Sequence, residues 1–290
     1  MASLLALLSS ALWGTADFFA GKLSKKFPAI AVLGINQAFG LFTGVTLVLI
    51  TGDWGAQALG EGLFGMGGYL IPGILAGFSG YAGLICLYAG LSTGRMGVVS
   101  PISSLSALIP LGYALFYKGD QLSLLLTIGV VAATLGGFLA SGPEVSQGLP
   151  LKPIALALGA AVFFGSALIF MSIGSESSAL MTMTTMRTAT LIIGVGIFLY
   201  NIKKGGRAFG GIGKKEIPLL IFIGIADFAA NLLLGVATTK GLVSLAMVLG
   251  SLYPIATALL AYKLLHERLH RVQYVGIAFA VFGVALISAF

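Results

Sequence analysis

The chain has 290 residues, of which 58% are hydrophobic and 9% are charged, and its formal net charge is +7. A water-soluble domain carries about 25% charged residues, so this composition excludes a soluble globular enzyme and indicates a membrane protein. Continuous apolar runs also exclude a membrane β-barrel, whose strands alternate apolar and polar residues over about ten positions. We therefore expect an all-α integral membrane protein.

Ten apolar segments of membrane-spanning length follow one another along the chain. A helix needs about 20 apolar residues to cross the hydrocarbon core, and the connections between the segments hold nearly all of the charge. Only Asp17, Arg187 and Asp227 fall well inside the segments. The predicted transmembrane helices are residues 3–21, 29–50, 68–90, 97–117, 121–140, 153–173, 178–200, 217–239, 242–264 and 271–289.

Lysine and arginine residues gather in alternate connections. The connections after the first, third, fifth, seventh and ninth spans hold most of the 16 basic residues. Basic connections face the cytoplasm, so we expect a multi-pass protein of the cell inner membrane with both termini on the non-cytoplasmic side. Membrane orientation accounts for the positive charge, and nucleic acid is not an expected partner.

A unit of five spans occurs twice. Residues 94–100 align with residues 238–244 at an offset of 144, which also places Pro110 on Pro254. Because five is odd, the second copy enters the membrane from the opposite side, and we expect two inverted five-helix repeats with a site between them. The predicted units are residues 1–142 and 150–290. Asp120, Gly129 and Gly136 align with Glu267, Gly276 and Gly283 at an offset of 147, Gln37 aligns with Arg187, and Gly14 aligns with Gly165.

Two five-helix halves, a first span reading ALWGTADFFA at residues 11–20, and a central proline in the fourth span of each half resemble the drug/metabolite transporter superfamily. The closest similarity is to its EamA-like ten-helix branch, and it covers almost the whole chain. The resemblance implies a secondary carrier whose central cavity is lined by spans 1, 3, 4, 6, 8 and 9. It implies alternating access, export rather than uptake, and neither a covalent cofactor nor an ATP-binding domain.

Charged residues inside the spans are the first candidates for a site, because a charge at a helix centre costs about 2.5–3.5 kcal/mol. Asp227 shares a helix face with Asn231, four residues further on, and Arg187 lies at a similar depth in its own span. Two interpretations stay open. Asp227 and Arg187 form a structural ion pair, or Asp227 faces the cavity and binds a proton or a cation.

Trp13 and Asp17 share a face of the first span. Asp17 is either a helix-end carboxylate paired with Lys22 or a gate residue of the cavity, and Trp13 either packs in the core or stacks on a ring or a cation. Pro110 and Pro254 are candidate hinges for alternating access. Further candidates for the cavity, with core packing as the alternative, are Tyr81, Tyr88, Ser104, Ser251 and Tyr253.

The sequence indicates no enzyme, no metal site and no other cofactor, since it offers no nucleophile with a matching base and too few grouped metal ligands. The expected partners are a small-molecule substrate, membrane lipid and, as a candidate coupling ion, the proton. Monomer and homodimer both stay open.

Three transport functions are compatible with these features. The first hypothesis is a secondary exporter of small metabolites such as amino acids or related amphipathic solutes. The alternatives are a proton-coupled exporter of cationic drugs or amines and an uncoupled facilitative pore. The exporter of cations predicts that Asp17 and Asp227 both reach the cavity while Arg187 is turned away or locked in a pair. An arginine that points freely into the cavity would repel cations and favour carboxylate-bearing solutes.

Overall fold

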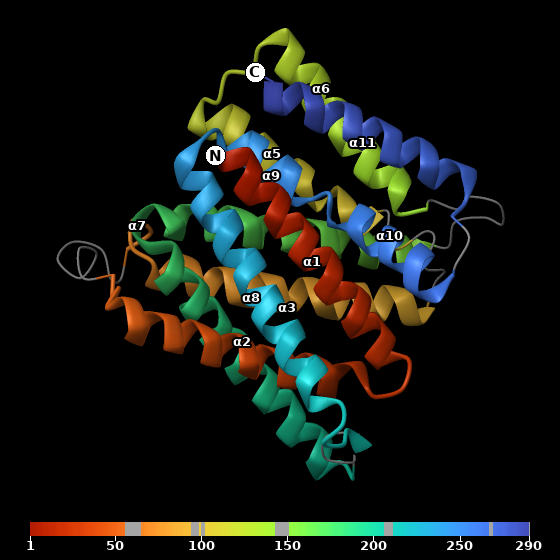
Figure 1. Ribbon diagram of the computed structural model, residues 1–290. Helices are drawn as coiled ribbons and strands as arrows, with labels where there is room; N and C mark the ends of the chain where they lie inside the picture. The colour runs from red at the N-terminus through yellow and green to blue at the C-terminus, as the bar shows by residue number, and fades with distance from the viewer. Residues whose placement is uncertain are drawn as a thin grey trace.

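The computed structural model describes residues 1–55, 65–93, 99, 102–142, 151–205, 211–266 and 269–289. The regular elements in these residues are helices, without strands (Figure 1). The helices are α1 (Ala2–Ser24), α2 (Ala29–Thr51), α3 (Leu70–Thr93), α5 (Leu108–Tyr113), α6 (Leu124–Ala140), α7 (Leu151–Lys203), α8 (Ile217–Lys240), α9 (Val243–Gly250), α10 (Tyr253–Leu265) and α11 (Arg271–Ala289).

Seven helical segments of the described residues are long and apolar enough to cross a membrane, if α9 and α10 are taken together, and α6 is a shorter apolar helix. The described part of the predicted span 97–117 is divided into a 3-10 turn, α5 and a π-helical turn, so this span differs from the prediction. The predicted spans 153–173 and 178–200 correspond to the two halves of α7, which are separated by a kink at Ser178 with φ −156° and ψ 113°. The predicted span 242–264 is divided into α9 and α10 by a turn at Ser251 and Leu252.

Local hydrogen bonding and proline explain these breaks. The Ser178 hydroxyl accepts a hydrogen bond from the Met181 backbone N–H at 3.1 Å, so it caps the second half of α7. Pro254 lies in the first turn of α10, where a missing N–H costs nothing, and it therefore begins a helix rather than kinking one. Pro110 lies in α5 between a 3-10 turn at Leu105–Ala107 and a π-helical turn at Ala114–Lys118. The predicted hinge positions thus coincide with irregular helix.

The main helix contacts join the two halves of the chain (Figure 1). α3 packs along α7, and α1 packs against α8, α9 and α10. α2 lies on α7 and α8, and α6 lies along α11. Large apolar side chains such as Leu49, Phe116 and Phe282 are exposed on the outside of the bundle. An apolar outer surface of this kind is expected where the solvent is lipid.

The contact between α6 and α11 depends on glycine. A Cβ atom on Gly136 would lie 2.4 Å from the Ala280 nitrogen, and a Cβ atom on Gly283 would lie 2.4 Å from the Ala133 nitrogen. Small residues let two helix backbones approach this closely. Gly136 aligns with Gly283, and Ala133 aligns with Ala280 at the same offset of 147. Each half therefore makes the same contact with the other.

The connections at one end of the bundle, here called the Asp120 end, are joined by polar contacts between the two halves. Lys118 and Glu176 form an ion pair. The Asp120 carboxylate accepts hydrogen bonds from the backbone N–H of Ser244 at 2.9 Å and from its hydroxyl at 2.7 Å. The opposite end, here called the Lys22 end, holds exposed lysines of the connections after α1 and before α8.

Candidate functional site

Asp227 of α8 is the centre of a polar network inside the bundle. Its Oδ1 atom accepts hydrogen bonds from Trp13 Nε1 at 3.1 Å and from Asn231 Nδ2 at 3.2 Å. Its Oδ2 atom lies 2.8 Å from Arg187 Nη2 in an ion pair. Asn231 reaches Asp227 because residues four apart lie on one helix face. α1, α7 and α8 thus converge on a single carboxylate.

Both Nη atoms of Arg187 have polar partners. Its Nη1 atom donates to Gln37 Oε1 at 2.7 Å, and the Thr190 hydroxyl donates to the same oxygen at 2.9 Å. The side chain of Arg187 is 5% exposed, against 20% for Asp227. Burying a guanidinium is tolerated when an opposite charge and hydrogen bonds satisfy it. Of the two interpretations of Asp227, the structure therefore contains the ion pair with Arg187.

Asp17 differs from Asp227 in having no such partner. Among the residues that the structure describes, it forms neither an ion pair nor a side-chain hydrogen bond, and Lys22 does not reach it. Its side chain is exposed, although it lies within α1 and close enough to Asp227 for the two carboxylates to repel each other. Asp17 is thus a carboxylate without a counter-charge beside a neutralised ion pair.

Two aromatic rings border Asp17. The rings of Trp13 and Tyr253 meet edge to face, with centroids 6.2 Å apart and planes at 75°. The Thr257 hydroxyl donates to the Gly14 carbonyl at 3.0 Å and fixes α1 against α10. Tyr253 also lies within electrostatic range of Asp17. A carboxylate close to aromatic rings offers a cation both charge and an aromatic surface.

Three of the remaining predicted cavity residues, Tyr81, Ser104 and Ser251, belong to other contacts. Tyr81 is buried in α3, and its hydroxyl faces Gly194 of α7. Ser104 accepts a hydrogen bond from the Ser141 hydroxyl at 3.4 Å, and Ser251 donates to the Val248 carbonyl at 2.7 Å. The Tyr88 side chain lies outside the described part of the structure. Of the predicted set, the contacts bring together Trp13, Arg187, Asp227, Asn231 and Tyr253.

Three residues of the site, Gln37, Thr190 and Thr257, lie outside the predicted set. Gln37 entered the sequence analysis only as the residue that aligns with Arg187. Thr190 lies three residues after Arg187, so the same helix face carries both toward Gln37, and this spacing was the available signal. Thr257 had no comparable signal, because a hydroxyl that bonds a backbone carbonyl on another helix follows no spacing rule. In the described residues there is no group of three or more His, Cys, Asp and Glu residues that could hold a metal ion.

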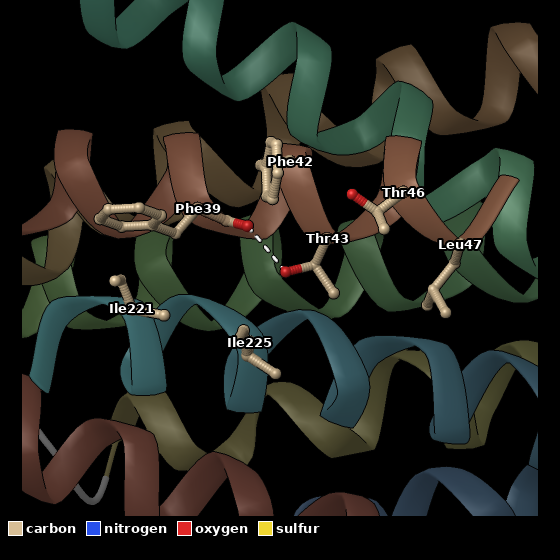
Figure 2. A pocket seen from close by; sticks show the side chains of 7 residues that line it. All are labelled: Phe39, Phe42, Thr43, Thr46, Leu47, Ile221 and Ile225. Atoms are coloured by element: carbon tan, nitrogen blue, oxygen red, sulfur yellow. Dashed lines mark hydrogen bonds between the residues drawn. The ribbon is translucent and has the colours of Figure 1, made fainter. Parts of the chain in front are cut away.

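A separate groove of about 290 Å³ lies between α2 and α8 (Figure 2). Phe42 and Ile225 at its edge are exposed, so the groove opens on the outside of the bundle. Behind it the helices touch, because a Cβ atom on Gly224 would lie 2.7 Å from the Asn36 carbonyl oxygen. Asp227 is not among the residues that line the groove. Its walls are Phe39, Phe42, Thr43, Thr46, Leu47, Ile221 and Ile225.

Comparison with known proteins agrees with a two-unit organisation. A family model described as the EamA-like transporter family matches residues 1–142 and again residues 151–289. A solved structure described only as "Crystal structure of protein" is similar to this chain with a TM-score of 0.76 and 17% sequence identity, over 99% of this chain and 96% of the other. At that identity the similarity concerns the fold alone. No curated protein matches the sequence.

Proposed function

The chain belongs to the EamA-like transporter family, and on this premise we propose that it is a secondary transporter whose solute is an organic cation. The observation that carries the proposal is the unequal state of the charges in the site. Arg187 is locked between Asp227 and Gln37, whereas the Asp17 carboxylate is exposed and has no ion-pair partner in the described part of the chain. The charge offered to a solute is therefore negative.

The aromatic rings support the same class of solute. Trp13 and Tyr253 lie beside Asp17, and an ammonium group near a ring face gains about 0.5–2 kcal/mol from the ring electrons. An amine that carries an apolar or aromatic body would use the carboxylate and the rings together. A proton would compete with the amine for Asp17, and this competition would couple proton entry to solute exit.

Amino acids and other carboxylate-bearing solutes fit the site less well. Such a solute needs a free cationic donor, and both Nη atoms of Arg187 already have partners. Its remaining nitrogen, Nε, is buried and faces Gly40 of α2. The exporter of cationic amines, one of the alternatives from the sequence, is thus favoured over the exporter of amino acids.

The proposed mechanism is alternating access between two inverted repeats of five spans, ten spans in all. Reciprocal contacts support it. A Cβ atom on Gly14 would lie 2.5 Å from the backbone carbonyl oxygen of Tyr253. A Cβ atom on Gly165 would lie 2.4 Å from the Cβ atom of Ile109. Gly14 aligns with Gly165, and Tyr253 and Ile109 each precede one of the aligned prolines. Two halves that make the same contacts can exchange their conformations, which gives two states related by the pseudo-two-fold axis.

The test is counterflow in proteoliposomes with a labelled aromatic ammonium compound. The proposal expects saturable exchange that falls at least about tenfold in Asp17→Asn, because the attraction of a full charge is lost. Asp53→Asn is the matched control and should exchange normally, since Asp53 lies in the connection after α2. Exchange of an organic anion that disappears in Arg187→Met would overturn the choice of solute. Single-channel currents without exchange would support the facilitative pore instead.

A further inference from the structure

A small hollow at the Lys22 end joins the two halves of the chain. It measures about 140 Å³ and lies between the last turn of α1 and the segment that leads into α8. The residues around it come from both halves and combine charged and apolar side chains. They are Lys22, Leu23, Lys26, Phe27, Lys215, Glu216 and Leu219.

The charge around this hollow is mainly positive. Lys22, Lys26 and Lys215 are exposed, and in the described residues none of the three forms an ion pair. Glu216 is the acidic residue of the lining, and its carboxylate already accepts a hydrogen bond from the Gly213 backbone N–H at 3.0 Å. The N-terminus of α8, which has no side-chain cap, adds the partial positive charge of a helix start.

The wall of the hollow is apolar. Leu23 is 6% exposed, and Phe27 and Leu219 pack against the buried cluster that contains Leu220 and Ile223. A small hydrophilic anion would gain nothing from this wall. A ligand with a negative head and an apolar body would gain from both parts.

We propose that this hollow binds one anionic phospholipid, with the phosphate between the three lysine ammonium groups and the first carbons of the acyl chains against Phe27 and Leu219. The position suits this ligand, because Lys22 lies at the end of a membrane-length helix, where lipid headgroups are found. Basic pockets between helix ends are a known chemistry for anionic headgroups.

The lipid would also act on transport, and this second part rests on the proposed function. α1 carries Trp13 and Asp17, and α8 carries Asp227. A headgroup held by Lys22 and Lys215 ties these two helices together at the Lys22 end. Anionic lipid would therefore favour the conformation in which that end is closed around the site.

The binding test uses the purified full chain in a neutral detergent, with phosphatidylglycerol added in steps and the apparent melting temperature as the readout. A ligand that binds the folded protein raises this temperature by mass action. The lining variant is Lys22→Gln with Lys26→Gln and Lys215→Gln. Its matched control is Lys25→Gln with Lys203→Gln and Lys214→Gln, which removes the same charge from the neighbouring connections without touching the lining.

The site predicts that phosphatidylglycerol stabilises the wild type and the control variant, and that the lining variant needs at least about tenfold more lipid for the same shift. Phosphatidylcholine and inorganic phosphate should give no shift. Equal weakening in both variants would overturn the site in favour of diffuse surface charge. A full shift with inorganic phosphate alone would overturn the choice of a lipid.

Two arrangements keep the test decisive. If the lining variant does not fold, Lys215→Gln alone is compared with Lys214→Gln, because both residues are exposed and adjacent in the chain. The melting readout involves no solute, so lipid binding can succeed while the proposed cation transport fails. Counterflow at equal rates in vesicles with and without phosphatidylglycerol would refute only the effect on transport.

Discussion

The α6–α11 interface and the Asp227 network both join the two halves of the chain, but only the first repeats residue by residue. Gly136 meets Ala280, and their aligned counterparts Gly283 and Ala133 meet in the same way. In the network, Arg187 donates to Gln37, which is the residue that aligns with it. Two aligned positions thus touch, and one of them is charged while the other is neutral.

This difference separates the requirements of the fold from those of the site. Close contact between the backbones of α6 and α11 needs glycine in both copies. A Cβ atom on either glycine would clash with the backbone of the facing helix. A buried charge is costly, so a chain keeps it only where it acts and gives it a partner there. Substitutions in the symmetric contacts should therefore lower the free energy of unfolding equally in both halves. Substitutions of Arg187 and of its aligned residue Gln37 should lower it unequally.

The largest effect is expected for Arg187→Met. It leaves the half-buried Asp227 carboxylate without its counter-charge, and because breaking a fully buried pair costs about 3–5 kcal/mol, we expect a loss toward the lower end of that range in the free energy of unfolding. Gln37→Leu, at the aligned position, removes a neutral partner and should cost less, about 1–2 kcal/mol. Chemical unfolding in detergent measures both.

A second variant tests the reason for this inequality. Combining Arg187→Met with Asp227→Leu removes both charges, and apolar replacement of a whole buried pair is close to neutral. The double variant should be more stable than Arg187→Met alone. If Arg187→Met and Gln37→Leu had the same cost, the charge would contribute nothing to the network.

A methyl group added to the α6–α11 interface should lower the free energy of unfolding by less than Arg187→Met does. The loss should be the same in each half. Gly136→Ala and Gly283→Ala each place a Cβ atom 2.4 Å from a backbone nitrogen, and overpacking of this kind costs about 1–3 kcal/mol. Gly196→Ala is the control, because nothing lies within 4 Å of its added Cβ atom. Thermal unfolding measures the three. A large difference between the first two would argue against equivalent halves.

Trp13→Phe should have a smaller effect, which is confined to the network. Phenylalanine keeps an aromatic edge near Tyr253 but loses the N–H that donates to Asp227, and a hydrogen bond to a charged group is worth about 1.5 kcal/mol or more. The exposed Trp54 provides the control variant Trp54→Phe. Melting temperatures that fall equally in both variants would show that the Trp13 hydrogen bond is not specific.

The smallest effect is expected at the Asp120 end. Lys118→Gln breaks the ion pair with Glu176. Because both side chains of this pair are partly exposed, the loss in the free energy of unfolding should be below about 1 kcal/mol and should shrink at high salt. Glu176 raises the pKa of the Lys118 ammonium. The pair therefore stabilises the fold at neutral pH, and its contribution is lost as the pH rises through the raised pKa. Unfolding measured at two salt concentrations and at alkaline pH tests this.

The sequence predicted the helical class and the two matching units, because these follow from apolar length and repetition. It predicted a break between residues 173 and 178, but it did not predict that the Ser178 hydroxyl caps the second half of α7, since one side-chain hydrogen bond leaves no trace in apolar length. Nor could it place Trp13 on Asp227, because the two are 214 residues apart and meet only through the packing of α1 on α8.

The central claim is that the site offers a solute one available carboxylate and no available cation. Its most direct test is the binding of an aromatic ammonium compound and of the carboxylate of the same shape, titrated calorimetrically against the wild type, Asp17→Asn and Asp53→Asn. We expect the ammonium compound to bind the wild type and Asp53→Asn, to bind Asp17→Asn at least about tenfold more weakly, and to be preferred over the carboxylate. Unchanged affinity in Asp17→Asn, or tighter binding of the carboxylate, would contradict the account.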